Sequence, residues 1–322
     1  MFSMMAALRP KWLNVLNVLW ITTAFFAVCK GAVNNRPIIG VLAQTTYDEM
    51  AEYGPSYIAA SYVKFLESAG ARVVPIAVNQ TQDYYVKLFS SLNGVLFPGG
   101  SQYLETSGYG KAGRILYDLA VKANDNGDYF PLWGTCLGFE LLIYLTAEEN
   151  LMTYTNSTNI AYPVYFQKDF KTTRLFASAP EKIIQILENE NVTFNAHHNG
   201  VTPKNFSTSA KLKSFYKIIS TNFDKNGLEF ISMTEAYKYP FYASQWHPEK
   251  NIFEWTVKER INHSKDAMAA SLYFTNFFVN EARKNFHKFP NPAEEEAALI
   301  YNYKPMYTGK ISSYDQSYFF GV

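Results

Sequence analysis

Short apolar runs alternate with longer amphipathic stretches through the first half of the chain. The runs are rich in β-branched residues, as buried strands are, and the amphipathic stretches repeat apolar residues at the spacing of one helix face. We expect strands over 37–43, 72–78, 94–97 and 129–133, and helices over 57–69, 83–92, 112–123 and 139–145. Because strands and helices alternate, we predict right-handed parallel crossovers. The expected fold class is α/β, a doubly wound, mostly parallel sheet with helices on both faces.

The second half of the chain mixes element types. We expect strands over 217–221, 228–233 and 241–246, and helices over 183–187 and 267–284. Asn226-Gly227 lies between the first two of these strands and predicts a hairpin turn. No Pro- or Ser-rich linker and no internal repeat divides the sequence, so we predict a single domain over residues 32–289. Residues 290–322, rich in Tyr and Pro, are expected to follow an irregular path over its surface.

The N-terminus has the pattern of a secretory signal peptide. Arg9 and Lys11 precede a mostly apolar stretch, 12–28, and small residues follow it. A membrane anchor is the alternative, but a span needs about 20 predominantly apolar residues, and this stretch is short and interrupted by polar ones. We therefore expect residues 1–31 to be cleaved, the mature protein to enter the secretory pathway, and no membrane attachment to remain.

Five Asn-x-Ser/Thr sequons agree with this route, because N-glycosylation belongs to secreted proteins. The sequons begin at Asn79, Asn156, Asn191, Asn205 and Asn262. Those at Asn79 and Asn205 lie in polar, loop-like sequence, where a glycan is tolerated. We expect the mature protein to be a glycoprotein.

Composition and motif content exclude several classes of protein. Hydrophobic residues make up 48% of the chain, which excludes intrinsic disorder. The net charge is +1, without a long basic run, and this argues against a nucleic-acid partner. No cluster of His, Cys and carboxylate residues has metal-ligand spacing, and no G-x-x-x-x-G-K-S/T loop is present. We therefore expect no metal, no ATP and no other cofactor.

Cys136 is the one cysteine expected in the mature chain, because Cys29 falls in the signal peptide. A lone cysteine is more often a buried core residue than a nucleophile. Here, however, Gly134 and Gly138 flank it between a predicted strand and a predicted helix, which is the arrangement of a nucleophile elbow. The glycines allow the two backbones to approach closely, and the helix N-terminus favours a thiolate. We predict that Cys136 is a nucleophile.

A cysteine nucleophile needs a base, and the chain has five histidines. His247 follows the predicted strand over 241–246, at the sheet edge where open α/β sheets bind ligands. Glu249 lies two residues further, on the same side if the segment is extended, so its carboxylate could orient the imidazole. We predict Cys136, His247 and Glu249 as nucleophile, base and orienting acid. A capping or surface histidine is the alternative for His247.

A glycine pair follows the predicted strand over 94–97. Gly99 and Gly100 would let backbone N–H groups approach a ligand closely. Together with the N–H of Leu137 they could form an oxyanion hole, in which each donor contributes about 3 kcal/mol. An ordinary turn is the alternative for the pair taken alone.

Three motifs occur in order along the chain: FPGGS over 97–101, WGTCLGFE over 133–140 and QWHPEK over 245–250. Together they resemble the class I glutamine amidotransferase-like fold and, more narrowly, the gamma-glutamyl hydrolase family, lysosomal and secreted peptidases acting on folate poly-gamma-glutamates. RPIIG over 36–40, YIAASY over 57–62 and ESAGARVVP over 67–75 also match that family. The resemblance covers residues 36–289, and the tail beyond them has no motif that matches.

The resemblance implies roles for individual residues. It makes Cys136 the nucleophile and His247 the general base and acid. His197 corresponds to a second functional histidine of the hydrolases, although the adjacent His198 leaves this register open. Glu140 stands where amidotransferases usually carry Gln, and its carboxylate is expected to accept a hydrogen bond from a substrate N–H; a helix-N-terminal carboxylate without such a role is the alternative. The family also implies a homodimer located in the lysosome and the extracellular space.

We therefore expect a cysteine hydrolase that cleaves gamma-glutamyl isopeptide bonds of folate and antifolate poly-gamma-glutamates through a thioester. One alternative is a glutaminase-type amidotransferase domain, which would carry Gln in place of Glu140 and need a partner domain. Another is a secreted pteridine- or peptide-binding protein without turnover, whose binding would be indifferent to Cys136. Exo- or endo-cleavage, the contacts of the pterin and the alpha-carboxylates, and the need for Glu249 stay open.

Overall fold

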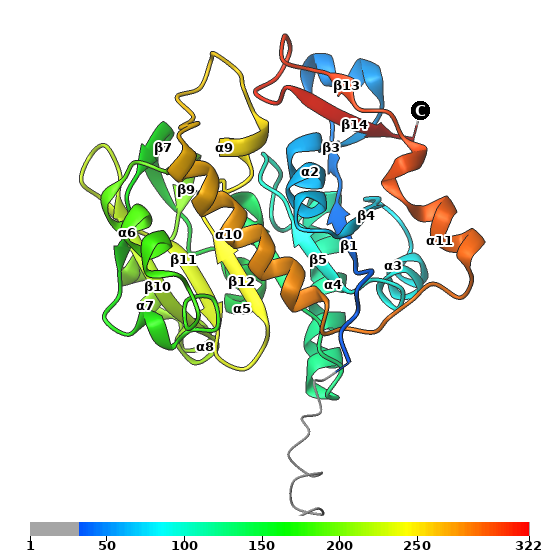
Figure 1. Ribbon diagram of the computed structural model, residues 1–322, viewed down its shortest axis with the longest axis horizontal. Helices are drawn as coiled ribbons and strands as arrows, with labels where there is room; N and C mark the ends of the chain where they lie inside the picture. The colour runs from blue at the N-terminus through cyan, green and yellow to red at the C-terminus, as the bar shows by residue number, and fades with distance from the viewer. Residues whose placement is uncertain (1–31, 322) are drawn as a thin grey trace, which may run out of the picture. The chain divides into compact units, whose positions relative to one another are not determined.

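An eight-stranded sheet with the order β4-β1-β5-β6-β12-β11-β10-β8 organises the computed structural model, which describes residues 32–321 (Figure 1). Its strands are β1 (Ile38–Leu42), β4 (Arg72–Ile76), β5 (Gly94–Phe97), β6 (Leu132–Thr135), β8 (Tyr165–Phe166), β10 (Tyr216–Phe223), β11 (Glu229–Ala236) and β12 (Phe241–Ser244). The five strands from β4 to β12 pair in parallel, and β11, β10 and β8 continue the sheet in antiparallel pairs. The predicted mostly parallel α/β sheet is confirmed, as is the β10–β11 hairpin.

Helices cover both faces of the sheet because neighbouring residues of its strands point to opposite sides. Ile39 and Val41 of β1 pack with α2 (Ala60–Ser68), α6 (Glu181–Asn189) and α10 (Lys265–Ala282). Ile38 and Leu42 pack into a second cluster on the other face. The helices of that second cluster are α3 (Gln82–Phe89), α4 (Gly108–Asp125), α5 (Leu137–Ala147), α7 (Pro203–Thr208) and α8 (Ala210–Phe215). Figure 1 shows α10 crossing its face of the sheet, and α10 contacts both α2 and α6.

The helix predicted over 57–69 is correct only from Ala60 onward. Residues Ser56–Ala59 form the strand β3, which pairs with β2 (Gln44–Thr45) and with β14 (Gln316–Phe320). Tyr57 and Ile58 are buried as residues of this strand, and not as part of a helix face. The helix ends as expected, because Gly70 has φ of 85° and its N–H closes the last turn on the Glu67 carbonyl.

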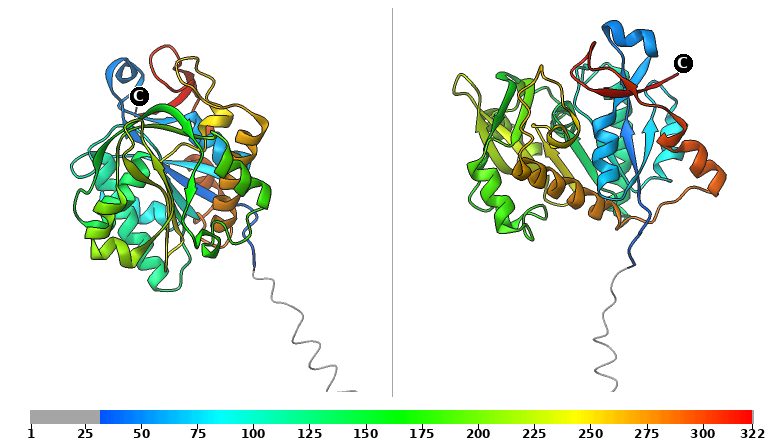
Figure 2. Two further views of the ribbon diagram at one scale, coloured as in Figure 1. Left: turned by 90° about the vertical axis from the view of Figure 1, so that its left-hand side faces the viewer. Right: turned by 45° about the horizontal axis from the view of Figure 1, so that its top comes forward.

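The tail predicted to be irregular is ordered, and this prediction was wrong. It contains α11 (Pro292–Ala298), the 3-10 turn η3 (Ile300–Asn302), β13 (Met306–Tyr307) and β14. A second sheet with the order β13-β14-β3-β2 joins it to the N-terminal part of the chain. The red tail strand lies beside the blue β3 in both Figure 1 and Figure 2. A pairing between segments so distant in sequence leaves no local pattern from which to predict it.

Several elements differ from the sequence expectation in extent or were not expected. The strand predicted over 129–133 is Leu132–Thr135, and α4 begins at Gly108 because Ser107 caps it through its hydroxyl. The strands β7 (Thr153–Tyr162) and β9 (Thr193–Gly200) form a separate antiparallel pair. The remaining elements are α9 (Lys250–Phe253) and the 3-10 turns η1 (Asp48–Tyr53) and η2 (Phe170–Thr172). Of the helices in the described part, none has the length and apolarity that a membrane span requires.

The predicted signal peptide, residues 1–31, lies outside the described residues. Of the sequons, Asn79 and Asn191 are exposed. Asn205 was expected in a loop but lies inside α7. Its amide group donates to the Leu151 carbonyl (3.1 Å) and to Thr153 Oγ1 (2.8 Å). Because a glycan would replace one of the two amide hydrogens, glycosylation of Asn205 would break at least one of these bonds.

Candidate active site

Cys136 sits at the turn between β6 and α5, in the arrangement of a nucleophile elbow. Its φ of 53° is in the left-handed region, which non-glycine residues rarely occupy and which costs on the order of 1–3 kcal/mol. Two backbone bonds hold the turn: the Cys136 N–H donates to the Ser244 carbonyl (2.8 Å), and the Cys136 carbonyl accepts the Glu140 N–H (3.0 Å). The strain is therefore balanced by the sheet on one side and the helix on the other.

The two glycines beside Cys136 are required by close backbone contacts. A Cβ at Gly134 would lie 2.4 Å from the Gly138 carbonyl oxygen, and one at Gly138 would lie 2.0 Å from that of Phe97. Both distances are shorter than any side chain tolerates. The close approach expected from this glycine spacing is present in the structure.

His247 and Glu249 lie in the turn that follows β12. His247 Nδ1 is 2.7 Å from Glu249 Oε1, and both side chains are buried. Glu249 has helical dihedrals (φ −74°, ψ −27°), so a turn, and not the extended segment expected from the sequence, brings the two together. A carboxylate on Nδ1 fixes the imidazole tautomer and leaves Nε2 available as a base.

Gly99 marks the place where the thiol and the imidazole meet. A Cβ at this glycine would lie 3.0 Å from Cys136 Cβ and 2.7 Å from His247 Cε1. The structure therefore brings Cys136, His247 and Glu249 into one cluster, as the sequence analysis predicts. Any side chain in place of Gly99 would displace the imidazole or the cysteine.

Tyr62 belongs to this cluster and was not identified from the sequence. Its buried hydroxyl accepts the Gly99 N–H (2.8 Å) and lies 3.3 Å from His247 Nδ1. The Gly99 N–H is therefore engaged within the protein and is not free to bind an oxyanion, which corrects the role expected for it. Tyr62 was predicted only as part of an apolar helix face, and nothing in its local sequence separates it from the many other tyrosines of the chain.

Gly100 and Leu137 remain as candidates for oxyanion binding. Both line the cavity beside the thiol, and the nearby Leu137 N–H lowers the pKa of that thiol. A Cβ at Gly100 would lie 1.7 Å from Gln44 Oε1, while Gln44 Nε2 donates to the Gly99 carbonyl (2.7 Å). The glycine at position 100 thus makes room for a glutamine that supports the loop.

The electrostatics of Cys136 differ from the sequence expectation of a favoured thiolate. Burial raises the pKa of its thiol, and the nearby Glu140 and Glu249 raise that pKa further. The Leu137 N–H and Lys250 act in the opposite direction but do not outweigh burial. Burial therefore favours the neutral thiol, which must pass its proton to a base before it can attack.

Glu140 is buried in the first turn of α5 and accepts a hydrogen bond from Gln245 Nε2 (3.1 Å). Burial raises the pKa of this carboxyl to about 8, and the bond from Gln245 only partly opposes the shift. At neutral and acidic pH the group is protonated in the free protein. It can then donate as well as accept a hydrogen bond, whereas the sequence analysis expected an accepting carboxylate.

His197 and His198 on β9 both line the larger cavity, but they differ in environment. His197 is buried, its Nδ1–H donates to the Asn199 carbonyl (2.7 Å), and its Nε2 lies 3.0 Å from Asn195 Oδ1. Burial lowers the pKa of His197 to about 3, so the ring is neutral. His198 is exposed and stacks on Tyr154. His197 is therefore fixed as a neutral part of the cavity wall.

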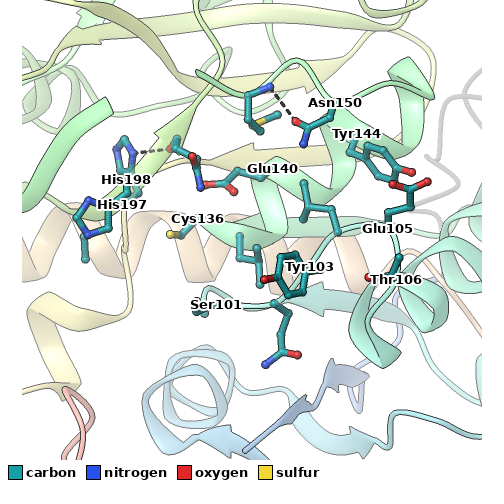
Figure 3. A pocket seen from close by; sticks show the side chains of 17 residues that line it. Ser101, Tyr103, Glu105, Thr106, Cys136, Glu140, Tyr144, Asn150, His197 and His198 are labelled. Atoms are coloured by element: carbon teal, nitrogen blue, oxygen red, sulfur yellow. Dashed lines mark hydrogen bonds between the residues drawn. The ribbon is translucent and has the colours of Figure 1, made fainter. Parts of the chain in front are cut away.

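Two cavities meet at Cys136. The larger, of about 840 Å³, extends past Glu140, Tyr144 and His197, and Figure 3 shows these side chains around the thiol. The smaller, of about 180 Å³, lies toward His247 and also contains Tyr314 of the tail. Cys136 therefore lines both cavities. Among residues 32–321, no group of three or more His, Cys, Asp or Glu is placed to hold a metal ion.

Comparison with known proteins decides the family. The peptidase C26 family profile matches residues 37–249. Gamma-glutamyl hydrolase of Homo sapiens is 48% identical over 291 residues, which cover 90% of this chain and 91% of the relative. The chain belongs to the gamma-glutamyl hydrolase family. Gamma-glutamyl hydrolase of Rattus norvegicus is 48% identical over 287 residues, covering 89% of this chain and 90% of the relative. Gamma-glutamyl hydrolase B of Dictyostelium discoideum is 43% identical over 293 residues, covering 90% and 84%.

Similarity to solved structures is weaker. A glutamine amidotransferase of Thermotoga maritima shares 11% identity with a TM-score of 0.44, covering 77% of this chain and 98% of that one. The structure of PurLQS from the same organism shares 14% identity with a TM-score of 0.45, covering 74% and 99%.

Membership of the gamma-glutamyl hydrolase family confirms the resemblance expected from the three motifs. The family profile spans the elbow and ends at Glu249. Lys250, the next residue, is 1% exposed and was not singled out from the sequence, although it lies in the same motif. What distinguishes Lys250 is its burial, which the sequence does not show.

Proposed function

We propose that this protein is a cysteine hydrolase that cleaves the gamma-glutamyl isopeptide bonds of folate and antifolate poly-gamma-glutamates. The observation that carries the proposal is a thiol on a strained elbow, beside a buried His247–Glu249 pair, in a chain 48% identical to curated gamma-glutamyl hydrolases. A binding protein without turnover has no use for this strain or for a buried imidazole paired with a carboxylate.

The reaction begins with proton transfer from Cys136 to His247 Nε2, because the buried thiol is neutral in the free enzyme. The sulfur then attacks the gamma-carbonyl carbon, and the oxygen takes the negative charge near the N–H groups of Leu137 and Gly100. His247 returns its proton to the leaving amine, the C–N bond breaks, and a gamma-thioester remains. Water, deprotonated by the same imidazole, attacks the thioester, and the proton returns to the sulfur as the acid leaves.

Glu249 is proposed to orient the imidazole and to stabilise its protonated form during both steps. Its 2.7 Å contact with Nδ1 keeps Nε2 as the reacting nitrogen. Because both groups are buried, their interaction is little weakened by solvent.

The larger cavity is proposed to accept the pteroyl side of the substrate. Its volume of about 840 Å³ suits a drug-sized group, whereas the smaller cavity suits little more than one amino-acid residue. Glu140, protonated and held by Gln245, is proposed to bond the amide of the glutamyl residue that forms the thioester. His197 is proposed to shape this wall.

The cellular setting is proposed from the sequence. The pattern of residues 1–31 and the five sequons support a secreted or lysosomal glycoprotein that is free of the membrane after cleavage. Exposed Asn79 and Asn191 are better placed to carry glycans than Asn205. A homodimer is proposed from the family resemblance, and the near-neutral charge supports a small-molecule substrate rather than nucleic acid.

The deciding experiment is mass spectrometry of a pteroyl penta-gamma-glutamate incubated with the mature protein at acidic pH, beside Cys136→Ala. Shortened gamma-glutamyl chains from the wild type alone are expected, and the product lengths distinguish exo- from endo-cleavage. An intact substrate with both proteins would overturn the proposed function. Cleavage by both proteins would remove Cys136 from the mechanism.

A further inference from the structure

Lys250 is a buried cation inside the smaller cavity. Its side chain is 2% exposed, and Nζ lies over the rings of Phe194 (5.4 Å to the centroid) and Tyr314 (5.1 Å). Its ion-pair partner is Glu259, with Nζ 2.5 Å from Oε2. Because a buried ammonium is costly without an opposite charge, this position demands a carboxylate.

Glu259 supplies that carboxylate from a surface loop between α9 and α10. Its neighbours face outward: Val257 is fully exposed, and Lys258 and Arg260 are exposed. The loop is held on both sides of Glu259 by Asn159, which donates to the Lys258 carbonyl (3.2 Å) and accepts the Arg260 N–H (2.5 Å). The loop backbone is thus fixed on both sides of Glu259, whose side chain is 14% exposed.

The same cavity contains the reacting groups. Cys136, His247, Lys250 and Glu259 all line it, and Lys250 is its one lysine or arginine among the described residues. In a gamma-linked glutamate chain, every residue carries a free alpha-carboxylate next to its gamma-amide linkage. A leaving glutamate that enters the cavity brings a carboxylate into a space where the single cation is already paired.

We propose that Glu259 is a built-in competitor that holds Lys250 in the free enzyme and is displaced by a carboxylate of the leaving glutamate. The exchange replaces one carboxylate by another on Lys250, so the buried ammonium is never left unpaired, and Glu259 moves into water. This inference rests on the proposed function and adds a specificity determinant to it, because the site selects leaving groups that carry a carboxylate. Each such leaving group binds more weakly than it would to an unpaired Lys250, because it must first displace Glu259.

Glu259→Gln tests the competition because it removes the charge and keeps the shape. With a pteroyl di-gamma-glutamate, we expect KM to fall several-fold while kcat changes little. With the matching pteroylglutamyl gamma-(4-nitroanilide), whose leaving group has no carboxylate, KM should stay within about 2-fold of the wild type. Glu188→Gln, an exposed change on α6, is the matched control and should alter neither. An unchanged or raised KM for the di-glutamate would overturn the inference.

Thermal unfolding provides a readout that does not depend on turnover. Glu259→Gln should lower Tm, because Lys250 loses its counter-charge, and glutarate should raise Tm more in this variant than in the wild type. Equal glutarate shifts in both proteins would contradict displacement. If the wild type cleaves no gamma-glutamyl bond, the proposed function fails; if it cleaves but KM and the glutarate shifts are unaffected by Glu259→Gln, only the present inference fails.

Discussion

The hydroxyl of Tyr62 lies 3.3 Å from Nδ1 of His247 and accepts the N–H of Gly99 at 2.8 Å. One buried side chain on α2 therefore contacts both the proposed base and the glycine loop beside the thiol. Because Glu249 already binds the same Nδ1, Tyr62 acts as a second support for the ring. It is a positioning residue, since it touches the base and not the space where substrate would lie.

Tyr62→Phe removes the hydroxyl and keeps the ring. We expect kcat to fall roughly 10-fold, equivalent to about 1.4 kcal/mol, with KM nearly unchanged. The Gly99 N–H would lose its acceptor, which costs about 1–3 kcal/mol of stability when the group is buried. Steady-state kinetics on a gamma-glutamyl substrate and a thermal melt measure the two effects. A variant with normal kcat and a lowered Tm would limit Tyr62 to a structural role.

Glu249→Gln addresses whether the orienting acid is needed. The amide keeps the size but cannot stabilise a protonated imidazole, so we expect kcat to fall by roughly 100-fold or more. Activity should be measured across pH, because the variant lacks the carboxylate that stabilises the protonated imidazole. If kcat and the profile both match the wild type, Glu249 is dispensable.

Glu140→Gln should be mild at acidic pH. The buried carboxyl is protonated below a pKa of about 8, so the neutral amide reproduces its charge and most of its bonding. We expect kcat/KM within about 3-fold of the wild type near pH 5. Glu140→Leu, which removes the polar group from the same helix position, is the contrast and should lose considerably more. A large loss in Glu140→Gln would mean that the ionised form is required.

Glu254 predicts how stability changes with pH. Burial raises its pKa from 4.5 to about 7, opposed by the Asp315 N–H, the Ser61 side chain and Lys250, and increased by the Asp315 carboxylate. Because the folded chain binds this proton more tightly than the unfolded chain, the contribution to stability is complete below about pH 4.5. It is lost as the pH rises through 7.

The corresponding measurement is thermal unfolding at pH 5 and pH 7.5. Glu254 should make the wild type more stable at pH 5 than at pH 7.5. Glu254→Gln should therefore reduce the difference between the two Tm values. Glu188→Gln serves again as the exposed control and should leave the difference as it is. A pH difference of the same size in Glu254→Gln would show that the carboxyl is already ionised at pH 5.

Local sequence patterns predicted the parallel sheet and the elbow well because both depend on short-range rules. The spacing of Gly134 and Gly138 around Cys136 predicts a close approach of strand and helix backbones, and the structure has it. The start of α2 was placed too early because Tyr57 and Ile58 are buried by a strand distant in sequence. The same remote pairing makes the tail ordered where its composition suggested an irregular path.

The chemistry of the site was predicted as a set of residues more successfully than as a set of charges. Cys136, His247 and Glu249 were selected by motif and lie together. The protonation of Cys136 and Glu140 was expected to be the opposite of what burial imposes, because the depth of a side chain is not written in its neighbours. Tyr62 was missed for the same reason.

The pairing of β3 with β14 has a consequence for the order in which the site is completed during synthesis. Ser56 and Phe320, which the strand pair joins, are 264 positions apart, so the ribosome makes the thiol, the imidazole and the carboxylate long before Tyr314 and β14. A nascent chain could assemble its reacting groups while one wall of the smaller cavity is still missing. Catalytic competence and substrate selection would then arise at different moments in the life of one polypeptide.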